Sequence, residues 1–276
     1  MKNNMLRYNN ECLYLVKKTI YTSEENGTSF YKAIDNRTKR IVGIKEIVAP
    51  DKRSADELKK EINMLITLEK YSRNVPVLYD FHINGNTIYI IMQYIEGESL
   101  RDALNREKDE LLTEKTTKKN LMRLKKLGYV LSEIHRANGV QHKDLKPENI
   151  ILSENGMDLS VIDFGLTGMG ALRGTGTPFY RAPEQSKNFR GVYRTDRIDI
   201  FSFGLIMYEL LTGKRMDFME DLILSQDGKH WKEIKEIDNP FVPKKLNDVL
   251  KKCLAYDPEE RYESGGRLIC DLRKLI

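Results

Sequence analysis

The feature that most limits the possible folds is a change of hydrophobic pattern about a third of the way along the 276-residue chain. Before it, short runs rich in β-branched and aromatic residues are divided by turn-forming residues, a pattern typical of β-strands. One predicted helix interrupts them at Ala55–Leu68, because its apolar residues lie close to one helical face. The predicted strands are Tyr14–Ile20, Phe30–Asp35, Ile41–Glu46, Val77–Phe81 and Thr87–Met92.

Beyond the change, the apolar residues recur mostly with helical period. The predicted helices are Glu98–Asn105, Leu121–Asn138, Ile198–Leu211, Leu246–Ala255 and Gly266–Ile276. We therefore expect an α+β fold in which a small strand-rich lobe precedes a larger helical lobe. Residues 1–276 are expected to form one domain, divided into lobes at about 11–95 and 96–276. Polar motifs between the two lobes favour an enzyme with a cleft.

Charge and cysteine content exclude several classes of protein. The net charge of +5 comes from bases interspersed with acids, so we expect a solvated mixed-charge surface and no nucleic-acid partner. The basic run Lys115–Lys126 is read in the same way, as a solvated helix face. Three cysteines without a CxxC pair predict neither disulfides nor a zinc site. With no apolar signal region or membrane-length apolar run, we expect a cytoplasmic chain without a membrane segment.

The most informative motif is the segment His142–Asn149, which reads HKDLKPEN. Its Asp144 and Asn149 can face one site, where the carboxylate orients a hydroxyl and accepts its proton while the amide oxygen ligates a hard cation. Asp163 follows a predicted strand and begins an Asp-Phe-Gly triplet. Oxygen ligands of this kind suit Mg²⁺, or Mn²⁺, bound to substrate phosphates. The motif therefore indicates phosphoryl transfer, which depends on positioning and charge neutralisation.

This segment resembles the catalytic loop of the eukaryotic-type (Hanks-type) serine/threonine protein kinases. Further motifs follow in the family's order. Val42–Lys45 resembles the lysine-bearing third strand, and Gly176–Glu184 resembles the end of the activation segment. Asp199–Gly204 resembles the helix that supports the catalytic loop, and Asp257–Arg261 a late motif whose arginine pairs with the activation-segment glutamate. The resemblance covers nearly the whole chain.

The resemblance implies a bilobal protein-kinase fold and a role for each matched residue. Lys45 would bind the α- and β-phosphates of ATP and pair with Glu61. Asp144 would orient the acceptor hydroxyl, and Asn149 and Asp163 would hold the metal ion. The remaining nucleotide-binding positions are Gly27, Thr28, Phe30, Gly43, Met92, Gln93, Ile95 and Ile151.

Two positions favour serine or threonine as acceptor and so predict a protein substrate of that kind. In serine/threonine-specific members of the family a residue like Lys146 lies near the γ-phosphate, and Thr177 matches the threonine that contacts it. The resemblance also implies two packing features. These are an apolar column of Leu65, Leu78, His142 and Phe164 anchored at Asp199, and an ion pair between Glu184 and Arg261.

The chain departs from the family in the loop that covers the phosphates. Ser23, Glu25 and Thr28 stand at the three glycine positions, and Gly27 lies one residue out of register. Glycine allows backbone amides to approach phosphate closely, so this loop predicts weakened nucleotide binding. A kinase-shaped regulatory module without catalysis, or pseudokinase, is therefore the alternative function. A phosphotransferase acting on small molecules is a third, and the intact Ala-Pro-Glu segment argues against it.

The adenine pocket and the activation segment carry further departures. Phe30 replaces a small valine above the adenine, and Gly43 replaces an alanine and returns some space. Lys143 replaces the arginine usual before the catalytic aspartate, which keeps the charge but loses the bidentate fork. Thr167 and Thr175 are the candidate sites of activating phosphorylation, which would make the chain a phosphoprotein.

Overall fold

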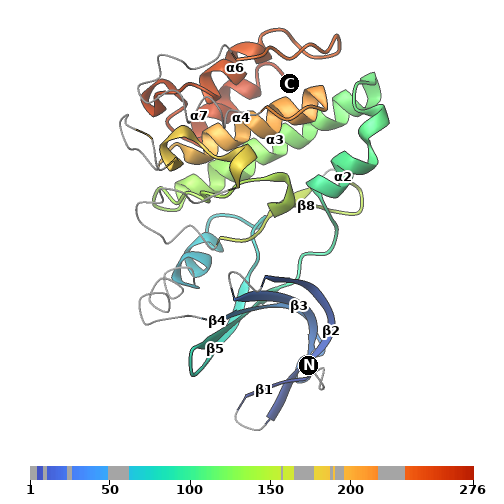
Figure 1. Cartoon of the computed structure of the whole chain (residues 1–276), viewed down its shortest axis with the longest axis vertical. Helices are drawn as coiled ribbons and strands as arrows, with labels where there is room; N and C mark the ends of the chain where they lie inside the picture. Colours follow the sequence, from blue (N-terminus) through green and yellow to red (C-terminus); the bar gives the residue numbers. More distant parts are fainter. Residues whose placement is uncertain are drawn as a thin grey trace.

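The computed structural model of the chain describes residues 5–8, 11–23, 27–48, 62–156, 158–164, 177–186, 189, 196–216 and 234–276. Figure 1 shows most of the strands gathered at the end of the molecule that holds the N-terminus, and most of the helices packed together at the other end with the C-terminus. The predicted arrangement of a strand-rich lobe followed by a helical lobe is therefore confirmed.

The first lobe contains an antiparallel sheet of six strands in the order β1-β2-β3-β4-β6-β5. Its strands are β1 (Met5–Tyr8), β2 (Glu11–Ser23), β3 (Thr28–Asp35), β4 (Ile41–Val48), β5 (Leu78–Asn84) and β6 (Thr87–Gln93). All five predicted strands are present, and β1 is an additional edge strand. The hairpin predicted at Asn84-Gly85-Asn86 joins β5 to β6, and Gly85 supplies the positive φ of 59° that the turn requires.

Alternation along β4 gives its two faces different surroundings. Val42 and Ile44 belong to a small apolar cluster with Tyr31 and Ile91 on one face of the sheet. Ile47, which shares the other face with Lys45, packs into the main core with the helical residues 62–68. The register of β4 therefore directs the Lys45 side chain away from the small cluster and toward the interior of the molecule.

The second lobe is built on helices α2 (Leu100–Arg106), α3 (Glu114–Arg136), α4 (Ile198–Thr212), α6 (Leu246–Cys253) and α7 (Gly265–Leu272). Short 3₁₀ turns η1 (Lys108–Glu110), η2 (Pro147–Asn149), η3 (Pro178–Tyr180), η4 (Pro183–Gln185) and η5 (Pro258–Glu260) join them. A small sheet contains β7 (Glu98–Ser99), β8 (Ile150–Leu152) and β9 (Leu159–Val161). Helix α4 is buried along almost its whole length, and α3 lies beside it (Figure 1).

Helix α3 begins at Glu114, seven residues before the predicted start at Leu121, and Thr113 caps it. The first turns were missed because their core-facing residues are polar. Thr116 and Asn120 are buried there, and the Asn120 amide donates to the carbonyl oxygen of Leu210 at 2.8 Å. A hydrogen-bonded polar group can be buried at little cost, but it leaves no apolar period in the sequence.

The prediction that Lys115–Lys126 forms a solvated helix face is wrong at one position. Arg123 is only 1% exposed, and its guanidinium pairs with the carboxylate of Glu107 at 2.9 Å and with the carbonyl oxygen of Gly156 at 3.2 Å. The aliphatic and planar parts of arginine allow such burial when an acid is present to compensate the charge. Across the described ranges, no helix combines the length and the apolar character needed to cross a lipid bilayer.

Candidate active site

The loop that contains η2 places Asp144 in a dense set of hydrogen bonds. Its Oδ1 accepts from the backbone N–H of Thr177 at 2.9 Å and from the Thr177 hydroxyl at 3.0 Å. Its Oδ2 accepts from the Lys146 ammonium at 2.8 Å, and the same ammonium donates to the Thr177 hydroxyl oxygen at 2.8 Å. The structure therefore brings together the predicted catalytic aspartate, the lysine predicted to lie near the γ-phosphate, and the threonine predicted to contact that lysine.

Asp199, at the start of α4, fixes the backbone that leads into this loop. Its two oxygens accept from the backbone N–H groups of His142 at 2.6 Å and Lys143 at 2.7 Å. It also accepts from Nε2 of His135 at 3.1 Å, since Nδ1 of that ring accepts from the backbone N–H of Gly265 at 2.9 Å. Three donors satisfy this fully buried carboxylate, and their hydrogen bonds hold its pKa below the ordinary value although burial raises it.

The ring of His142 links the loop to the strand that precedes Asp163. Its Nε2 donates to the carbonyl oxygen of Ile162 at 2.9 Å, and its Nδ1 accepts from the backbone N–H of Asp144 at 3.3 Å. The ring packs against Phe164 with centroids 4.7 Å apart. His142 is completely buried, and its neighbour Phe164 belongs to the main apolar core, which also includes Leu65. The histidine therefore has the packing role that the sequence predicted.

Asn149, one of the two predicted metal ligands, is hydrogen-bonded both to the catalytic loop and to the residue before Asp163. Its side-chain amide donates to the carbonyl oxygen of Asp144 at 3.0 Å, which leaves the amide oxygen as an acceptor. Its backbone carbonyl accepts from the N–H of Ile162 at 2.9 Å, next to Asp163. These two bonds bring Asn149 close in the fold to Asp163, although the two residues are fourteen apart in sequence.

The ammonium of Lys45 lies 2.9 Å from the carboxylate of Asp163 and is nearly buried. This cation lowers the pKa of Asp163 to about 2, so the carboxylate is ionised at neutral pH. Strand β4 and the second residue past the end of β9 thus contribute opposite charges to one site. Glu61, the predicted partner of Lys45, lies outside the described residues.

The predicted adenine-binding strand ends at Gln93. Met92 is buried beside Gly43, whose added Cβ would lie 3.6 Å from the Met92 side chain. The backbone N–H of Gln93 donates to the carbonyl oxygen of Val77 at 2.8 Å, so it is not available to a base. Ile95, two residues further on, is the other position in this segment predicted to contact the nucleotide through its backbone.

Phe30 and Gly43 fit each other across neighbouring strands. A Cβ at Gly43 would lie only 2.7 Å from the tip of the Phe30 ring, closer than atoms can approach. The ring also stacks with Tyr21 and Tyr94, at centroid distances of 6.1 and 6.4 Å. The absence of a side chain at residue 43 therefore lets the larger aromatic ring occupy this part of the lobe.

The other predicted nucleotide positions lie on elements around the same region. Gly27 precedes β3 with a positive φ of 58°, and its carbonyl accepts from Val48 at 2.8 Å. Thr28 begins β3 and pairs with Ile47. Ile151 lies half-buried in β8. The loop residue Glu25 and the candidate phosphorylation sites Thr167 and Thr175 lie outside the described residues.

The segment after Thr177 is fastened to the catalytic loop and to α4. The side chain of Gln185 donates to the carbonyl oxygen of Lys143 at 2.8 Å, and the Ser202 hydroxyl donates to that of Tyr180 at 2.8 Å. Glu184 and Arg261 form the predicted ion pair, with both side chains fully buried and contacts of 2.7 and 2.9 Å. Gln185 and Ser202 were not predicted, because neither stands out from ordinary polar residues in the sequence.

Two further residues, Arg101 and Glu209, were not predicted from the sequence, and they contact each other beside this segment. The Arg101 guanidinium donates to the Glu209 carboxylate at 2.7 Å and to Glu148 at 2.8 Å. One signal was present: Glu209 interrupts the apolar run Phe201–Leu211, and a charge within a buried helix needs a partner. The partner itself, over a hundred residues away, has no comparable signal.

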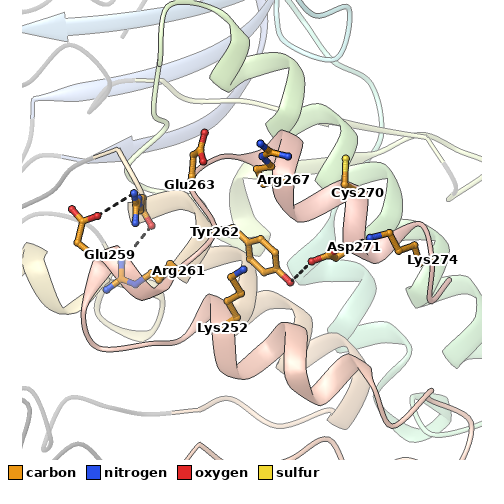
Figure 2. A pocket seen from close by; sticks show the side chains of 10 residues that line it. Lys252, Glu259, Arg261, Tyr262, Glu263, Arg267, Cys270, Asp271 and Lys274 are labelled. Atoms are coloured by element: carbon orange, nitrogen blue, oxygen red, sulfur yellow. Dashed lines mark hydrogen bonds and ion pairs between the residues drawn. The ribbon is translucent and has the colours of Figure 1, made fainter.

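A pocket of about 480 Å³ lies in the helical lobe between α6, η5 and α7 (Figure 2). Two of its three acids, Glu259 and Asp271, are paired with neighbouring bases and a hydroxyl. Glu259 lies 3.3 Å from Arg197, and Asp271 accepts from Tyr262 at 3.3 Å and from Lys274 at 2.8 Å. None of the predicted site residues lines this pocket.

Comparison with known proteins places these features in a family. The sequence pattern described as "Protein kinase domain" matches residues 25–267. A probable serine/threonine-protein kinase of Clostridium perfringens is 32% identical over 91% of this chain and 37% of its own length. A probable serine/threonine-protein kinase of Streptomyces coelicolor is 30% identical over 89% of this chain and 37% of its own length.

The serine/threonine-protein kinase PrkC of Bacillus subtilis is also similar. It is 29% identical over 72% of this chain and 31% of its own length. The chain therefore spans only about a third of the length of these curated relatives.

Proposed function

Because the chain belongs to the protein kinase domain family, we propose that it is a serine/threonine protein kinase that uses ATP to phosphorylate a protein. The observation that carries this proposal is the position of the Lys146 ammonium, 2.8 Å from both Asp144 and Thr177. A cation shared by a carboxylate and a hydroxyl matches what the transfer needs, namely an oriented acceptor and compensation of phosphate charge.

The chemistry that these residues support is an in-line displacement. The oxygen of the acceptor hydroxyl forms a bond to the γ-phosphorus of ATP, and the bond from that phosphorus to the bridging oxygen of ADP breaks. Asp144 accepts the proton that the hydroxyl loses, and Lys146 stabilises the negative charge of the transferring group. Lys45 binds the phosphates that remain on ADP.

The donor set at Asn149 and Asp163 fits Mg²⁺ or Mn²⁺. The Asn149 amide is fixed through its nitrogen, so its oxygen is the free ligand atom, and Asp163 is ionised at neutral pH. Hard oxygen donors of this kind suit these ions. When bound, the ion would neutralise charge on the phosphate oxygens.

A catalytically inactive nucleotide-binding module is the second candidate. The observation that favours it is the presence of Ser23 and Glu25 at glycine positions of the phosphate-covering loop. The retention of four groups argues for the enzyme, because the family resemblance puts them nearest the transferring phosphate: Lys45, Asp144, Asn149 and Asp163.

Incubation of the chain with Mg²⁺ and ATP labelled at the γ-phosphate, with and without a generic protein acceptor, tests the proposal. We expect label on serine or threonine, with the Asp144→Asn variant as the matched control. Thermal-shift titration with the same nucleotide separates the two candidates. If the chain binds Mg²⁺ and ATP but transfers no label to any acceptor, it is the catalytically inactive nucleotide-binding module.

A further inference from the structure

The pocket between α6, η5 and α7 has more bases than acids on its wall (Figure 2). The bases are Arg197, Lys252, Arg261, Arg267 and Lys274, and the acids are Glu259, Glu263 and Asp271. Because Arg261 is neutralised by Glu184, which does not line the pocket, four bases face three acids. The volume of about 480 Å³ lies within the range of sites that bind small molecules.

The inner wall of the pocket is held in place by bonds to neighbouring groups. Arg261 binds Glu184 through contacts of 2.7 and 2.9 Å. Nη1 of Arg197 donates to the carbonyl oxygen of Pro258 at 2.7 Å, and Nη2 lies 3.3 Å from Glu259. The third nitrogen of Arg197, Nε, is buried and has no hydrogen-bond partner within the described part of the chain. Since buried donors normally have an acceptor, this wall offers one unused donor.

Two further cations lie at the exposed side of the pocket. Lys252 and Arg267 are exposed, and neither side chain forms an ion pair with an acid that the structure describes. The ammonium of Lys252 lies over the Tyr262 ring, 4.3 Å from its centroid, and Figure 2 shows the two side chains together. Such a contact stabilises the cation and leaves N–H groups of the ammonium for an acceptor.

The acids of the pocket do not compensate these two cations. Glu259 is paired with Arg197. The hydrogen bond from Lys274, with a smaller contribution from Lys252, holds the pKa of Asp271 below its ordinary value, so that carboxylate is already occupied. Glu263 is the remaining acid, and it has no ion pair among the described residues. One carboxylate therefore remains against two cations.

We propose that this pocket binds a phosphate-bearing anion through Lys252, Arg267 and the unused Nε of Arg197. The guanidinium fork of arginine suits phosphate oxygens, and lysine binds them as a point charge. A cationic ligand would meet more free cations than free carboxylates. An apolar ligand would meet one aromatic ring, that of Tyr262, which Lys252 already covers. The site is independent of the proposed function, because none of these residues belongs to the candidate active site.

Cys270 provides a reporter inside the pocket. It is an exposed free cysteine that lines the wall, three residues after Arg267 on α7. An anion held beside Arg267 should shield the Cys270 thiol from alkylation. The test follows the reaction of Cys270 with N-ethylmaleimide, an uncharged reagent, by peptide mass spectrometry. Pyrophosphate or glycerol 3-phosphate is added at rising concentration without divalent ions, and sodium chloride at equal ionic strength controls for screening.

We expect the phosphate compounds to slow the alkylation saturably, beyond any effect of sodium chloride. Lys252→Gln and Arg267→Gln should each raise the half-saturating concentration by about two- to fivefold, the range of an exposed ion pair. Glu263→Gln should lower it, because the one free carboxylate repels the ligand. Arg273→Gln is the matched control and should leave it unchanged, since Arg273 is an exposed arginine at the end of α7 that does not line the pocket.

The two probes distinguish the source of the phosphate group. Stronger protection by pyrophosphate identifies an inorganic phosphate compound as the ligand, and stronger protection by glycerol 3-phosphate identifies an organic one. Alkylation that neither probe slows more than sodium chloride does would overturn the proposal. Equal shifts in Arg267→Gln and Arg273→Gln would also overturn it, because the surface as a whole would then attract the anion.

A second measurement decides the matter if Cys270 does not react in the parent chain. Equilibrium dialysis against radiolabelled pyrophosphate compares the parent with the Lys252→Gln, Arg267→Gln double variant and with Arg273→Gln. Less bound label in the double variant alone supports the proposal, and equal binding by all three overturns it. Neither measurement needs ATP or a protein acceptor, so failure of the proposed function would appear separately, as absent labelling of the acceptor protein.

Discussion

Among the described residues, three donors bind the carboxylate of Asp144, which is fewer than a carboxylate can accept. A carboxylate can accept about four hydrogen bonds, and the donors here are the Thr177 N–H and hydroxyl and the Lys146 ammonium. The remaining capacity is what an acceptor hydroxyl would use. The same donors fix the orientation of the carboxylate, so its geometry is set before substrate arrives.

Replacement of this carboxylate gives the first prediction. Asp144→Asn keeps the shape but cannot accept the proton, so we expect kcat to fall by about 10²-fold or more, as is typical of positioned acid–base groups. Nucleotide affinity should change little, because Asp144 does not contact Lys45 or Asp163 through any bond that the structure describes. Steady-state kinetics and a nucleotide titration check the two halves. Transfer at the parent rate in the variant would contradict the role given to Asp144.

The ion pair between Lys45 and Asp163 gives a second prediction, on pH. The folded-state pKa of Asp163 is about 2, below its ordinary value of 3.8, so the ionised carboxylate stabilises the folded chain. That contribution is complete above the ordinary value and is lost as the pH falls toward the folded-state value. The stability difference between parent and Asp163→Asn should therefore shrink between about pH 5 and pH 3. Urea unfolding at each pH measures this difference in the free energy of unfolding. A difference that does not change with pH would contradict a stabilising contribution from the ionised Asp163.

At the scale of elements, the strands β3 and β4 depend on each other through one contact. The Phe30 ring fills the space that a side chain at Gly43 would need, with only 2.7 Å to an added Cβ. The ring tip cannot remain in place if that space is filled. It must then move, against its stacking on Tyr21 and Tyr94, or force the two strands apart.

Gly43→Ala should therefore lower the free energy of unfolding by about 1–3 kcal/mol, the usual cost of overpacking, and weaken nucleotide binding. Phe30→Val combined with Gly43→Ala should recover much of both losses, because the smaller side chain leaves room for the methyl group. Urea unfolding of the four proteins in a double-mutant cycle gives the coupling between the two residues. Additive losses would mean that the contact between them is not the cause.

At the scale of the whole molecule, a buried ion pair connects the segment after Thr177 to the loop before α7. Glu184 and Arg261 are separated by 77 residues and are both fully buried, and Arg261 also bonds to the carbonyl oxygens of Ala255 and Tyr256. Removing one partner of such a pair leaves an uncompensated charge in the interior, which lowers the free energy of unfolding by about 3–5 kcal/mol.

Arg261→Met is expected to destabilise the helical lobe by that amount, and Arg261→Lys should rescue it poorly because a lysine lacks the two-pronged donor geometry. The control is Lys274→Ala, which removes an exposed pair with Asp271 and should change stability by less than about 1 kcal/mol. Thermal or urea unfolding of the three variants checks the order. Equal losses in Arg261→Met and Lys274→Ala would contradict the structural role of the buried pair.

The order of the elements and the chemical groups of the candidate site could be predicted from the amino-acid sequence alone. Alternating and helical hydrophobic patterns located five strands of the main sheet and the principal helices, because those periods reflect which face is buried. The HKDLKPEN segment and Asp163 identified the charged groups, because few structural needs call for those residues together. The spacing of residues along short stretches of the sequence was enough to predict both the elements and the charged groups.

Which charged groups meet across long stretches of chain could not be predicted without the folded structure. Arg101 and Glu209 come from separate helices, and Asp199 meets backbone N–H groups 56 and 57 residues earlier. Buried polar residues such as Asn120 hid the start of α3, because they are satisfied by partners that no local pattern reveals. The physical reason is the same in each case: hydrophobic burial has a period along the chain, whereas the pairing of polar groups depends on the packing of whole elements.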